Sequence, residues 1–341
     1  MSALPLAIVN TGLVTSVGLS APAACAAIRA GLANPTTTHF LGSDGRWITG
    51  HQVALEGAWR GWRRLVKMAT LAIAECLEKI PRERWQQVPM LLCVAEPERP
   101  GRTDGIDAHV FANIQRELGV EFAPGSLVIA SGRISVANAL LHARDLLASE
   151  PTPYVMIVAT DSLLTWPTLQ AYDRGQRLLT AQNPNGFTPG EGAGAVLIAR
   201  SEPGRRLSCD GIGLGNEASH IASEQPLRSN GLAHAINAAL ADAGCVLSDL
   251  DYRIADCSGE QYHFKEAALA VARLMHVRKQ EFDLWHPAEC IGETGALAGA
   301  ACIAVAAAAC SKEYGPGESL LFHASNDAGE RAAVVLRLRT T

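Results

Sequence analysis

The sequence is poor in charge and has no strong excess of either sign. Only 18% of its 341 residues are charged, and the formal net charge is -5. Because nucleic acids and anionic membranes are bound through concentrated positive charge, neither is expected as a partner. The densest basic group, Arg60, Arg63, Arg64 and Lys67, has the spacing of one helix face. This pattern is typical of a solvated surface, and the alternative is a landing site for an acidic partner protein.

Metal-binding, secretion and membrane-spanning patterns are also missing. The nine cysteines, at positions 25, 76, 93, 209, 245, 257, 290, 302 and 310, form no Cys-x-x-Cys pair and no Cys/His cluster, so we expect no metal and no other cofactor. Residues 1–5 lack the basic stretch of a signal peptide, so we expect a cytoplasmic protein with reduced thiols. The longest apolar run, residues 295–310, is too short and too rich in alanine to span a bilayer, and it predicts a buried helix.

The sequence does contain many apolar residues in alternating patterns. Hydrophobic residues make up 48% of the chain, which is enough for one large or two fused compact units. Short apolar strand patterns alternate with helix patterns, and fully apolar strands are typical of a parallel sheet covered on both faces. The first half predicts strands at residues 6–9, 90–95, 126–130, 154–159 and 193–199, and helices at 21–30, 61–80, 107–118 and 136–147.

The second half repeats this alternation. It predicts strands at residues 206–214, 251–255, 320–323 and 333–338, and helices at 231–243, 264–274 and up to Cys310. We therefore divide the chain into two similar units, residues 1–202 and 203–341. Such an alternation predicts an α/β architecture with right-handed crossovers. Two units in tandem predict two stacked sheets around a shared helix layer.

The most specific string is Pro-Gly-Glu-Gly-Ala-Gly-Ala-Val-Leu at residues 189–197. A glycine-rich phosphate cradle is followed by a helix, whereas a strand pattern follows here, so nucleotide binding is disfavoured. The string resembles a glycine-rich turn of the β-ketoacyl-acyl-carrier-protein synthases, or ketosynthases, of the thiolase superfamily. Residues 159–164 and 11–18 resemble two further segments of that family, in the right order and at the right spacing.

This resemblance covers nearly the whole chain and implies a thiolase fold, with five layers in the order αβαβα and two similar βαβ-type halves. It also implies a homodimer formed through an edge strand near the nucleophile turn. The family nucleophile is a Cys at a strand-to-helix turn, where the helix N-terminus lowers its pKa and backbone N–H groups bind the oxyanion. The matching position holds Ser131. A Ser hydroxyl needs an adjacent base to react, and the alternative is that Ser131 only caps the helix that follows.

The two family histidines are replaced as well. Aligned without gaps, residues 251–260 place Asp256 at the first His position, and residues 292–300 place Glu293 at the second. Ala288 stands where the family carries a Lys, and its C-terminal glycine turn corresponds to residues 326–331. The neighbouring candidates for the pocket are Glu191, Cys257, His286 and Asn326.

These replacements remove the chemistry of decarboxylative Claisen condensation. The histidines donate hydrogen bonds to a developing oxyanion, whereas an ionised Asp or Glu only accepts them. We therefore expect a ketosynthase-like protein that binds an acyl chain, an acyl carrier protein or another protein without condensing. The alternative is an active acyltransferase or ketosynthase, of fatty-acid or polyketide type, that uses Ser131 with Asp256 and Glu293 as carboxylate partners. A third hypothesis is an adaptor in an unrelated system.

Overall fold

The computed structural model describes residues 4–202 and 204–339, and within them ten strands form one hydrogen-bonded series. The strand order is β10-β9-β11-β12-β8-β1-β7-β6-β4-β5. One half of the series comes from the first part of the chain and the other half from the second. The first half contains β1 (Leu6–Val14), β4 (Met90–Cys93), β5 (Leu127–Ile129), β6 (Val155–Ser162) and β7 (Glu191–Arg200), and the second contains β8 (Arg206–Asn216), β9 (Tyr252–Ala255), β10 (Leu284–Trp285), β11 (Ser319–Ser325) and β12 (Glu330–Arg339).

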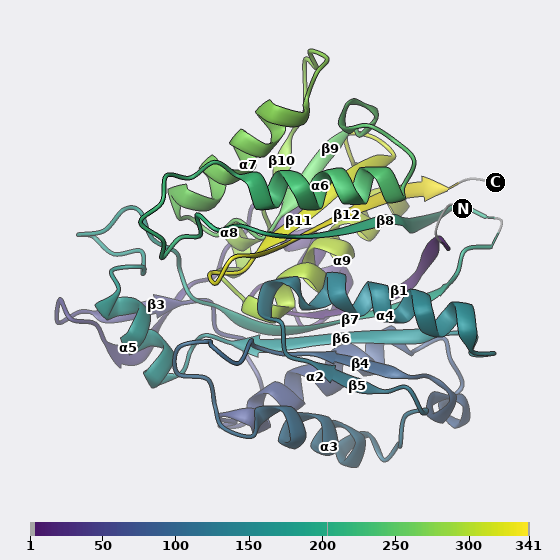
Figure 1. Cartoon of the computed structure of the whole chain (residues 1–341). Helices are drawn as coiled ribbons and strands as arrows, with labels where there is room; N and C mark the ends of the chain where they lie inside the picture. The colour runs from purple at the N-terminus through teal and green to yellow at the C-terminus, as the bar shows by residue number, and fades with distance from the viewer. Residues whose placement is uncertain (1–3, 203, 340–341) are drawn as a thin grey trace.

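Helices cover both halves of the sheet and fill the space between them (Figure 1). Buried side chains of the two middle helices pack with strands from both halves, which defines the central core. The outer cores lie under α2 and α3 on one side and under α6 and α7 on the other. This gives the five layers αβαβα, as predicted. The middle helices are α4 (Ser135–Ser149) and α9 (Ala298–Ser311), and the outer ones are α2 (Trp62–Cys76), α3 (Ile106–Leu118), α6 (Asn230–Asp242) and α7 (Gln261–Leu274).

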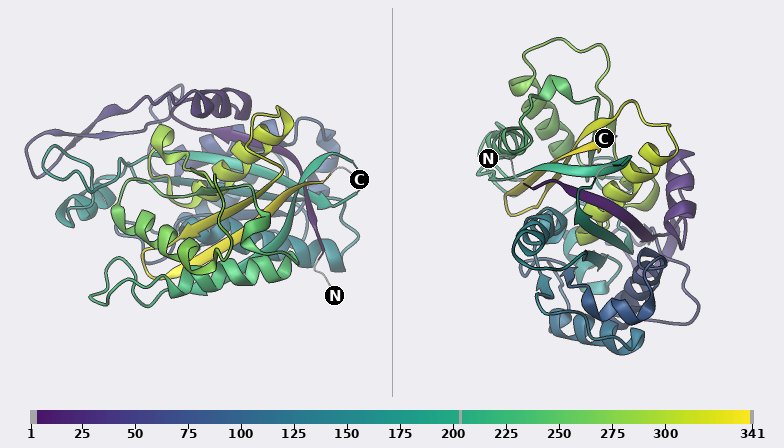
Figure 2. Two further views of the ribbon diagram at one scale, coloured as in Figure 1. Left: turned by 90° about the horizontal axis from the view of Figure 1, so that it is seen from above. Right: turned by 90° about the vertical axis from the view of Figure 1, so that its right-hand side faces the viewer.

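The middle helix α9 shows why the alanine-rich run folds as it does. A helix that is apolar on all sides is stable only when it is covered all round. Here α9 contacts α1 (Ala21–Arg29), α4 and strands of both halves. The right-hand view of Figure 2 shows blue helices of the first half at one end of the molecule and green helices of the second half at the other, with strands between them. No helix among the described residues is long and apolar enough to cross a membrane.

The sheet differs from the expected parallel arrangement in two ways. First, it is mixed: β6 pairs parallel with β4 but antiparallel with β7, and β1–β7 and β8–β12 are antiparallel. Strands buried on both faces are apolar in either direction, so the residue pattern did not distinguish the two. Second, the two half-sheets are joined by hydrogen bonding, because Leu6 and Ala7 of β1 pair with Cys209 and Ser208 of β8.

Several short elements were not predicted from the sequence. They include the hairpin of β2 (Thr36–Leu41) and β3 (Trp47–Gly50) and the helix α5 (Trp166–Arg174). The side chains of β2 are mostly exposed, β3 alternates between exposed and buried residues over only four positions, and α5 is a short helix of nine residues. The division of the chain into residues 1–202 and 203–341 stays a prediction. Residue 203 itself lies outside the described residues.

Candidate functional site

A sharp turn connects β5 to α4 and contains Ser131. Gly132 has φ +54°, and a Cβ at this position would lie 2.1 Å from Oε2 of Glu96, so only glycine fits. The Ser131 N–H donates to Oγ of Ser135 at 3.1 Å, and the Ser131 carbonyl accepts from Nδ2 of Asn326 at 2.9 Å. A 3-10 turn, Gly132–Ile134, precedes α4, and the Ser131 side chain makes no capping hydrogen bond. Ser131 therefore stands at the N-cap position of the 3-10 turn, as the alternative hypothesis expected, but its side chain does not cap the turn.

Asp256 and Glu293 lie on the C-terminal side of the same site, and each is 5% exposed. Asp256 follows β9, and its Oδ2 accepts the Ser325 N–H at 2.9 Å. Glu293 follows the short helix α8 (Ala288–Ile291). Its carboxylate accepts the Gly295 N–H at 2.9 Å and the Ser258 hydroxyl at 2.7 Å. Hydrogen bonds therefore fix both carboxylates before any cation is considered.

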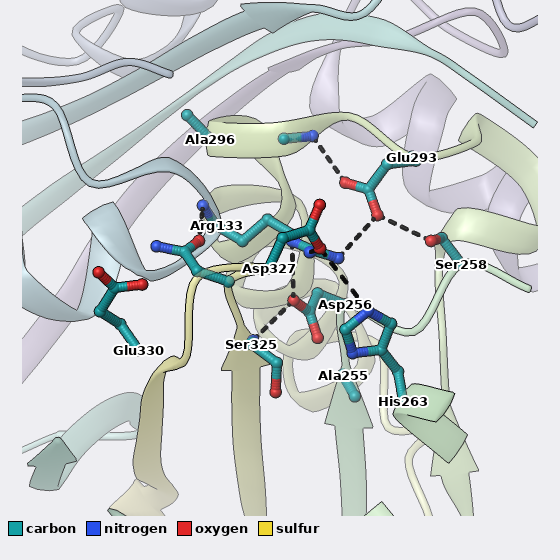
Figure 3. A network of polar contacts seen from close by, with 12 residues as sticks. Arg133, Ala255, Asp256, Ser258, His263, Glu293, Ala296, Ser325, Asp327 and Glu330 are labelled. Atoms are coloured by element: carbon teal, nitrogen blue, oxygen red, sulfur yellow. Dashed lines mark hydrogen bonds and ion pairs between the residues drawn. The ribbon is translucent and has the colours of Figure 1, made fainter. Parts of the chain in front are cut away.

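Arg133 brings these carboxylates together (Figure 3). Its guanidinium places Nη1 3.3 Å from Oε2 of Glu293 and Nε 3.8 Å from Oδ2 of Asp256, and it also pairs with Asp327. Arg133 is 6% exposed. We call these four residues the Arg133 cluster. No described residue makes a hydrogen bond with the Ser131 hydroxyl, so the structure joins Asp256 to Glu293 and leaves Ser131 outside the bonded group.

Burial and ion pairing set the charge of the Arg133 cluster. Burial raises the pKa of Asp256 to about 7, although Arg133 acts in the opposite direction. Burial also raises the pKa of Asp327, but Arg133 and Arg177 outweigh it and hold that pKa well below its usual value. Burial lowers the pKa of Arg133, yet Asp327 and Glu293 keep it well above normal. The cluster is thus a guanidinium surrounded by acceptors, and its N–H groups point at carboxylates.

A second layer of charge surrounds Asp327. Arg177 pairs with Asp327 and, through Nε, with Oε1 of Glu260 at 2.7 Å. His263 is 3% exposed, with Nε2 3.9 Å from Oε2 of Glu260 and 4.0 Å from Oδ1 of Asp327. Burial lowers the pKa of His263 well below its usual value. Neither of its ring nitrogens has a hydrogen-bond partner among the described residues, so a neutral imidazole lies beside the cluster.

Sequence reasoning missed the central residue of this site. Arg133 stands in an otherwise small and apolar turn, Val-Ile-Ala-Ser-Gly-Arg-Ile-Ser-Val-Ala at residues 128–137. A lone Arg in such a segment is unlikely to be left unpaired when buried, and this was the available signal. The partners Asp327 and Arg177 and the nearby His263 carried no comparable signal, because they lie far apart in sequence.

The other predicted pocket residues are placed differently. Asn326 contacts the turn directly, and its Oδ1 accepts the Arg133 N–H at 3.0 Å. Cys257 is buried next to Asp256, and burial raises its pKa well above normal. Glu191 is buried too, but its side chain points to Arg64, with Nε to Oε1 at 2.8 Å. His286 lies near the surface, 3.2 Å from Oε1 of Glu289, and is not part of the cluster.

Little free space remains around the Arg133 cluster. One cavity, of about 10 Å³, is lined by Arg133, Glu293, Asp327 and Arg99. A second cavity of about 10 Å³ lies behind Asp256 and Glu293. A single water molecule needs roughly this volume. These two cavities between the described residues are therefore too small for an acyl chain.

Comparisons with known proteins give the fold. No protein-family model matches the sequence, and no curated protein matches it. A complex of a type II polyketide synthase acyl-carrier protein with its hexaketide-bound ketosynthase matches with a TM-score of 0.80 at 15% identity, covering 98% of this chain and 99% of that one. A ketosynthase and chain length factor complex from Xenorhabdus doucetiae matches at 0.77 and 13%, covering 98% of both chains.

A third solved structure agrees with these two. The ishigamide ketosynthase/chain length factor matches with a TM-score of 0.77 at 16% identity, covering 98% of this chain and 99% of that one. At such low identity the likeness establishes architecture and leaves activity open. The predicted resemblance is confirmed at that level: the chain has the thiolase-type fold of the ketosynthases and chain length factors.

Proposed function

We propose that this chain is a ketosynthase-like protein that binds an acyl chain or a protein partner and does not perform decarboxylative Claisen condensation. The observation that carries this proposal is the Arg133 cluster. A guanidinium and three carboxylates occupy the region that the alignment assigns to the nucleophile and the two histidines. The same groups reduce the free volume there to about 10 Å³.

The chemistry of the cluster supports the proposal. Condensation needs a strong nucleophile and hydrogen-bond donors directed at the thioester oxygen that becomes negative. Asp256 and Glu293 are acceptors in their ionised form and oppose such a charge. The donors of Arg133 are engaged with Glu293 and Asp327. Loss of a single oxyanion donor lowers turnover by on the order of 10²–10³, and here both donors are replaced.

The alternative, an acyltransferase that uses Ser131, stays a prediction. A Ser nucleophile needs a base within hydrogen-bond distance. The Asp256 and Glu293 carboxylates are bound to Arg133 and to backbone or hydroxyl donors instead. His263 is a neutral imidazole, but its neighbours are Glu260 and Asp327. We find no observation that favours the alternative.

The matching complexes and the edge strand β5 both support a partner-binding role. Two of the matching structures are complexes of a ketosynthase with a chain length factor, and another contains an acyl-carrier protein. In this chain β5 is a terminal strand of the series and pairs only with β4 among the described strands. An unpaired edge is a template for strand pairing, so we propose a homodimer formed through β5.

Analytical ultracentrifugation of Leu127→Lys tests this interface. We expect the variant to sediment as a smaller species than the parent protein, and equal sedimentation would contradict the interface.

The central proposal is tested by carbon dioxide release. Purified protein is mixed with a malonyl-carrier protein, with and without an acyl primer, and Ser131→Ala serves as the control. We expect no release above that control and no condensation product by mass spectrometry. Turnover at about 1 per second or more, in the range of working enzymes, would overturn the proposal.

A further inference from the structure

A groove of about 770 Å³ opens on the surface of the N-terminal half. Its lining comes from the β2–β3 hairpin, from residues 52–65 with the start of α2, from residues 95–106 and from the start of α5. In Figure 1, β3 and α5 lie together at one end of the molecule. Sites for small molecules have volumes of about 300–1,000 Å³, so this groove has the size of a ligand site. We call it the Arg60 groove.

The charges that line the Arg60 groove are mainly positive. Four arginines line it, at positions 60, 64, 99 and 102, together with the carboxylates of Asp161 and Glu191. Arg64 pairs with Glu191, Arg99 with Glu96 and Asp161, and Arg102 with Asp107. Of the four arginines, Arg60 alone has no acidic partner among the described residues, and a free cation in a concave site attracts an anion.

The two carboxylates of the groove are already satisfied. Glu191 pairs with Arg64 and accepts the Val53 N–H at 3.0 Å. Asp161 is 3.2 Å from Nη1 of Arg99 and accepts a backbone N–H at 2.9 Å. Arg60, in contrast, is exposed and has no carboxylate within 4.0 Å among the described residues. The uncompensated cation is therefore at the mouth of the groove.

Part of the wall of the Arg60 groove is apolar. Phe40, Leu55, Trp59 and Ile106 line it, and Phe40 is held in place by stacking on Trp166 at 5.8 Å between ring centroids. Aliphatic and aromatic walls gain about 0.8 kcal/mol for each ligand methylene that they remove from water. The groove thus combines one free guanidinium with a surface suited to a hydrocarbon or aryl group.

We propose that the Arg60 groove binds an amphiphilic anion, with its carboxylate or phosphate at Arg60 and its apolar body along the walls. Arg99 lines both this groove and the small cavity of the Arg133 cluster, and it is paired with Glu96 and Asp161. This inference rests on the proposed binding role without condensation.

Isothermal titration calorimetry on the full chain tests the inference with four probes: decanoate, decyl phosphate, decanol and butyrate. We expect saturable binding of both decyl anions, weaker binding of decanol and none of butyrate. Tighter binding of decanoate would identify a carboxylate as the head group, and tighter binding of decyl phosphate would identify a phosphate. Arg60→Glu should weaken decanoate binding about tenfold, because an attraction becomes a repulsion. The matched control is Arg63→Glu, since Arg63 is also exposed but does not line the groove. It should bind as the parent protein does.

Three results would overturn the inference. They are the absence of saturable decanoate binding, equal affinity for decanol and decanoate, and equal effects of the Arg60 and Arg63 substitutions. Decanoate affinity that falls as the protein concentration rises would show that a second copy fills the groove, which also overturns it. The outcome of the carbon dioxide assay does not depend on any of these results. Failure of this inference can therefore be distinguished from failure of the proposed function.

Discussion

The Arg133 cluster and the Arg60 groove are built from the same kinds of side chain, yet they differ in free volume and in free charge. In the cluster, Arg133 contacts three carboxylates and about 10 Å³ remains open. In the groove, Arg60 has no acidic partner among the described residues and about 770 Å³ is open. Arg99 lies between the two regions. The comparison teaches that Arg133 and its acids leave little free volume, whereas Arg60 leaves a free cation at an open groove.

The two regions also differ in origin. All residues that line the groove come from the N-terminal half, between positions 34 and 191. The cluster joins Arg133 of that half to Asp256, Glu293 and Asp327 of the other. Removal of a charge should therefore have different consequences in the two places. Removal of the Arg133 charge should affect the contact between the halves, whereas removal of the Arg60 charge should affect only the binding of the proposed ligand.

The largest expected effect is that of Arg133→Met. The substitution leaves buried carboxylates without their cation, and breaking a buried ion pair costs about 3–5 kcal/mol of unfolding free energy. The comparison variant is Arg60→Met, an exposed change that should stay within about 0.5 kcal/mol. Urea unfolding followed by circular dichroism measures both.

A compensated variant separates lost pairing from lost packing. Arg133→Met combined with Asp256→Asn and Glu293→Gln removes the unpaired charges and should recover much of the stability. If Arg133→Met alone lost less than about 1 kcal/mol of unfolding free energy, Arg133 and Arg60 would contribute similarly to stability, which would contradict the comparison of the two regions. If the triple variant recovered nothing, the shape of Arg133 rather than its charge would be the important property.

Gly295→Ala tests how tightly the region between cluster and groove is packed. Gly295 has φ +56°, and a Cβ there would lie 2.0 Å from Oδ2 of Asp161, which pairs with Arg99. We expect a loss of about 2–4 kcal/mol from the left-handed backbone and the overpacking together. Gly31→Ala is the matched control, because Gly31 has φ +66° but no atom within 4 Å. Equal melting temperatures for the two variants would contradict the close contact.

The pH dependence of stability tests the buried charge of the cluster. The folded-state pKa of Asp256, about 7, lies above the ordinary value of about 3.9 that it regains on unfolding. Between about pH 4 and pH 7 the folded protein keeps a proton on Asp256 that the unfolded chain has released. The stability that Asp256 contributes is therefore complete below about pH 4 and is lost as the pH rises through 7. Arg133, Glu293 and Arg331 act on the same carboxyl.

The matching measurement uses Asp256→Asn. Relative to this variant, the parent protein should lose roughly 1 kcal/mol of unfolding free energy for each pH unit between about pH 5 and 7. The exposed control Asp104→Asn should follow the parent curve, because Asp104 makes no ion pair among the described residues. Parallel curves for the parent protein and Asp256→Asn would show that Asp256 titrates normally.

The smallest expected effect is on activity. Ser131→Cys combined with Asp256→His and Glu293→His introduces the residues that the resemblance predicts for a ketosynthase but leaves Arg133 and Asp327 in place. Catalytic groups about an ångström out of position lose on the order of 10²-fold, and the two cavities beside Glu293 among the described residues, of about 10 Å³ each, are too small for an acyl chain. We expect no condensation product. Mass spectrometry at position 131 is the measurement, and robust turnover would show that the scaffold is an intact synthase.

Much of the fold was predictable from residue patterns. Alternating strands and helices, the apolar run that became α9 and the glycine-rich start of β7 all have local causes. Gly192 shows such a cause directly, since a Cβ there would lie 2.4 Å from the Val14 carbonyl oxygen. The mixed strand directions and the hairpin β2–β3 were not predictable. Strand direction depends on which neighbours pair, and this leaves no mark on an apolar strand.

The sequence by itself determined which reactive groups are missing. The resemblance to the ketosynthases predicts that Ser131, Asp256 and Glu293 stand where that family has a Cys and two His, and this assignment stays a prediction. Only the tertiary structure decided what replaces them. Arg133 is separated from its partner Asp327 by 194 positions in the chain, and a buried cation meets acids from a distant segment only when both halves are folded together. The ion pairs of the site depend on distances through space, which no local pattern of residues records.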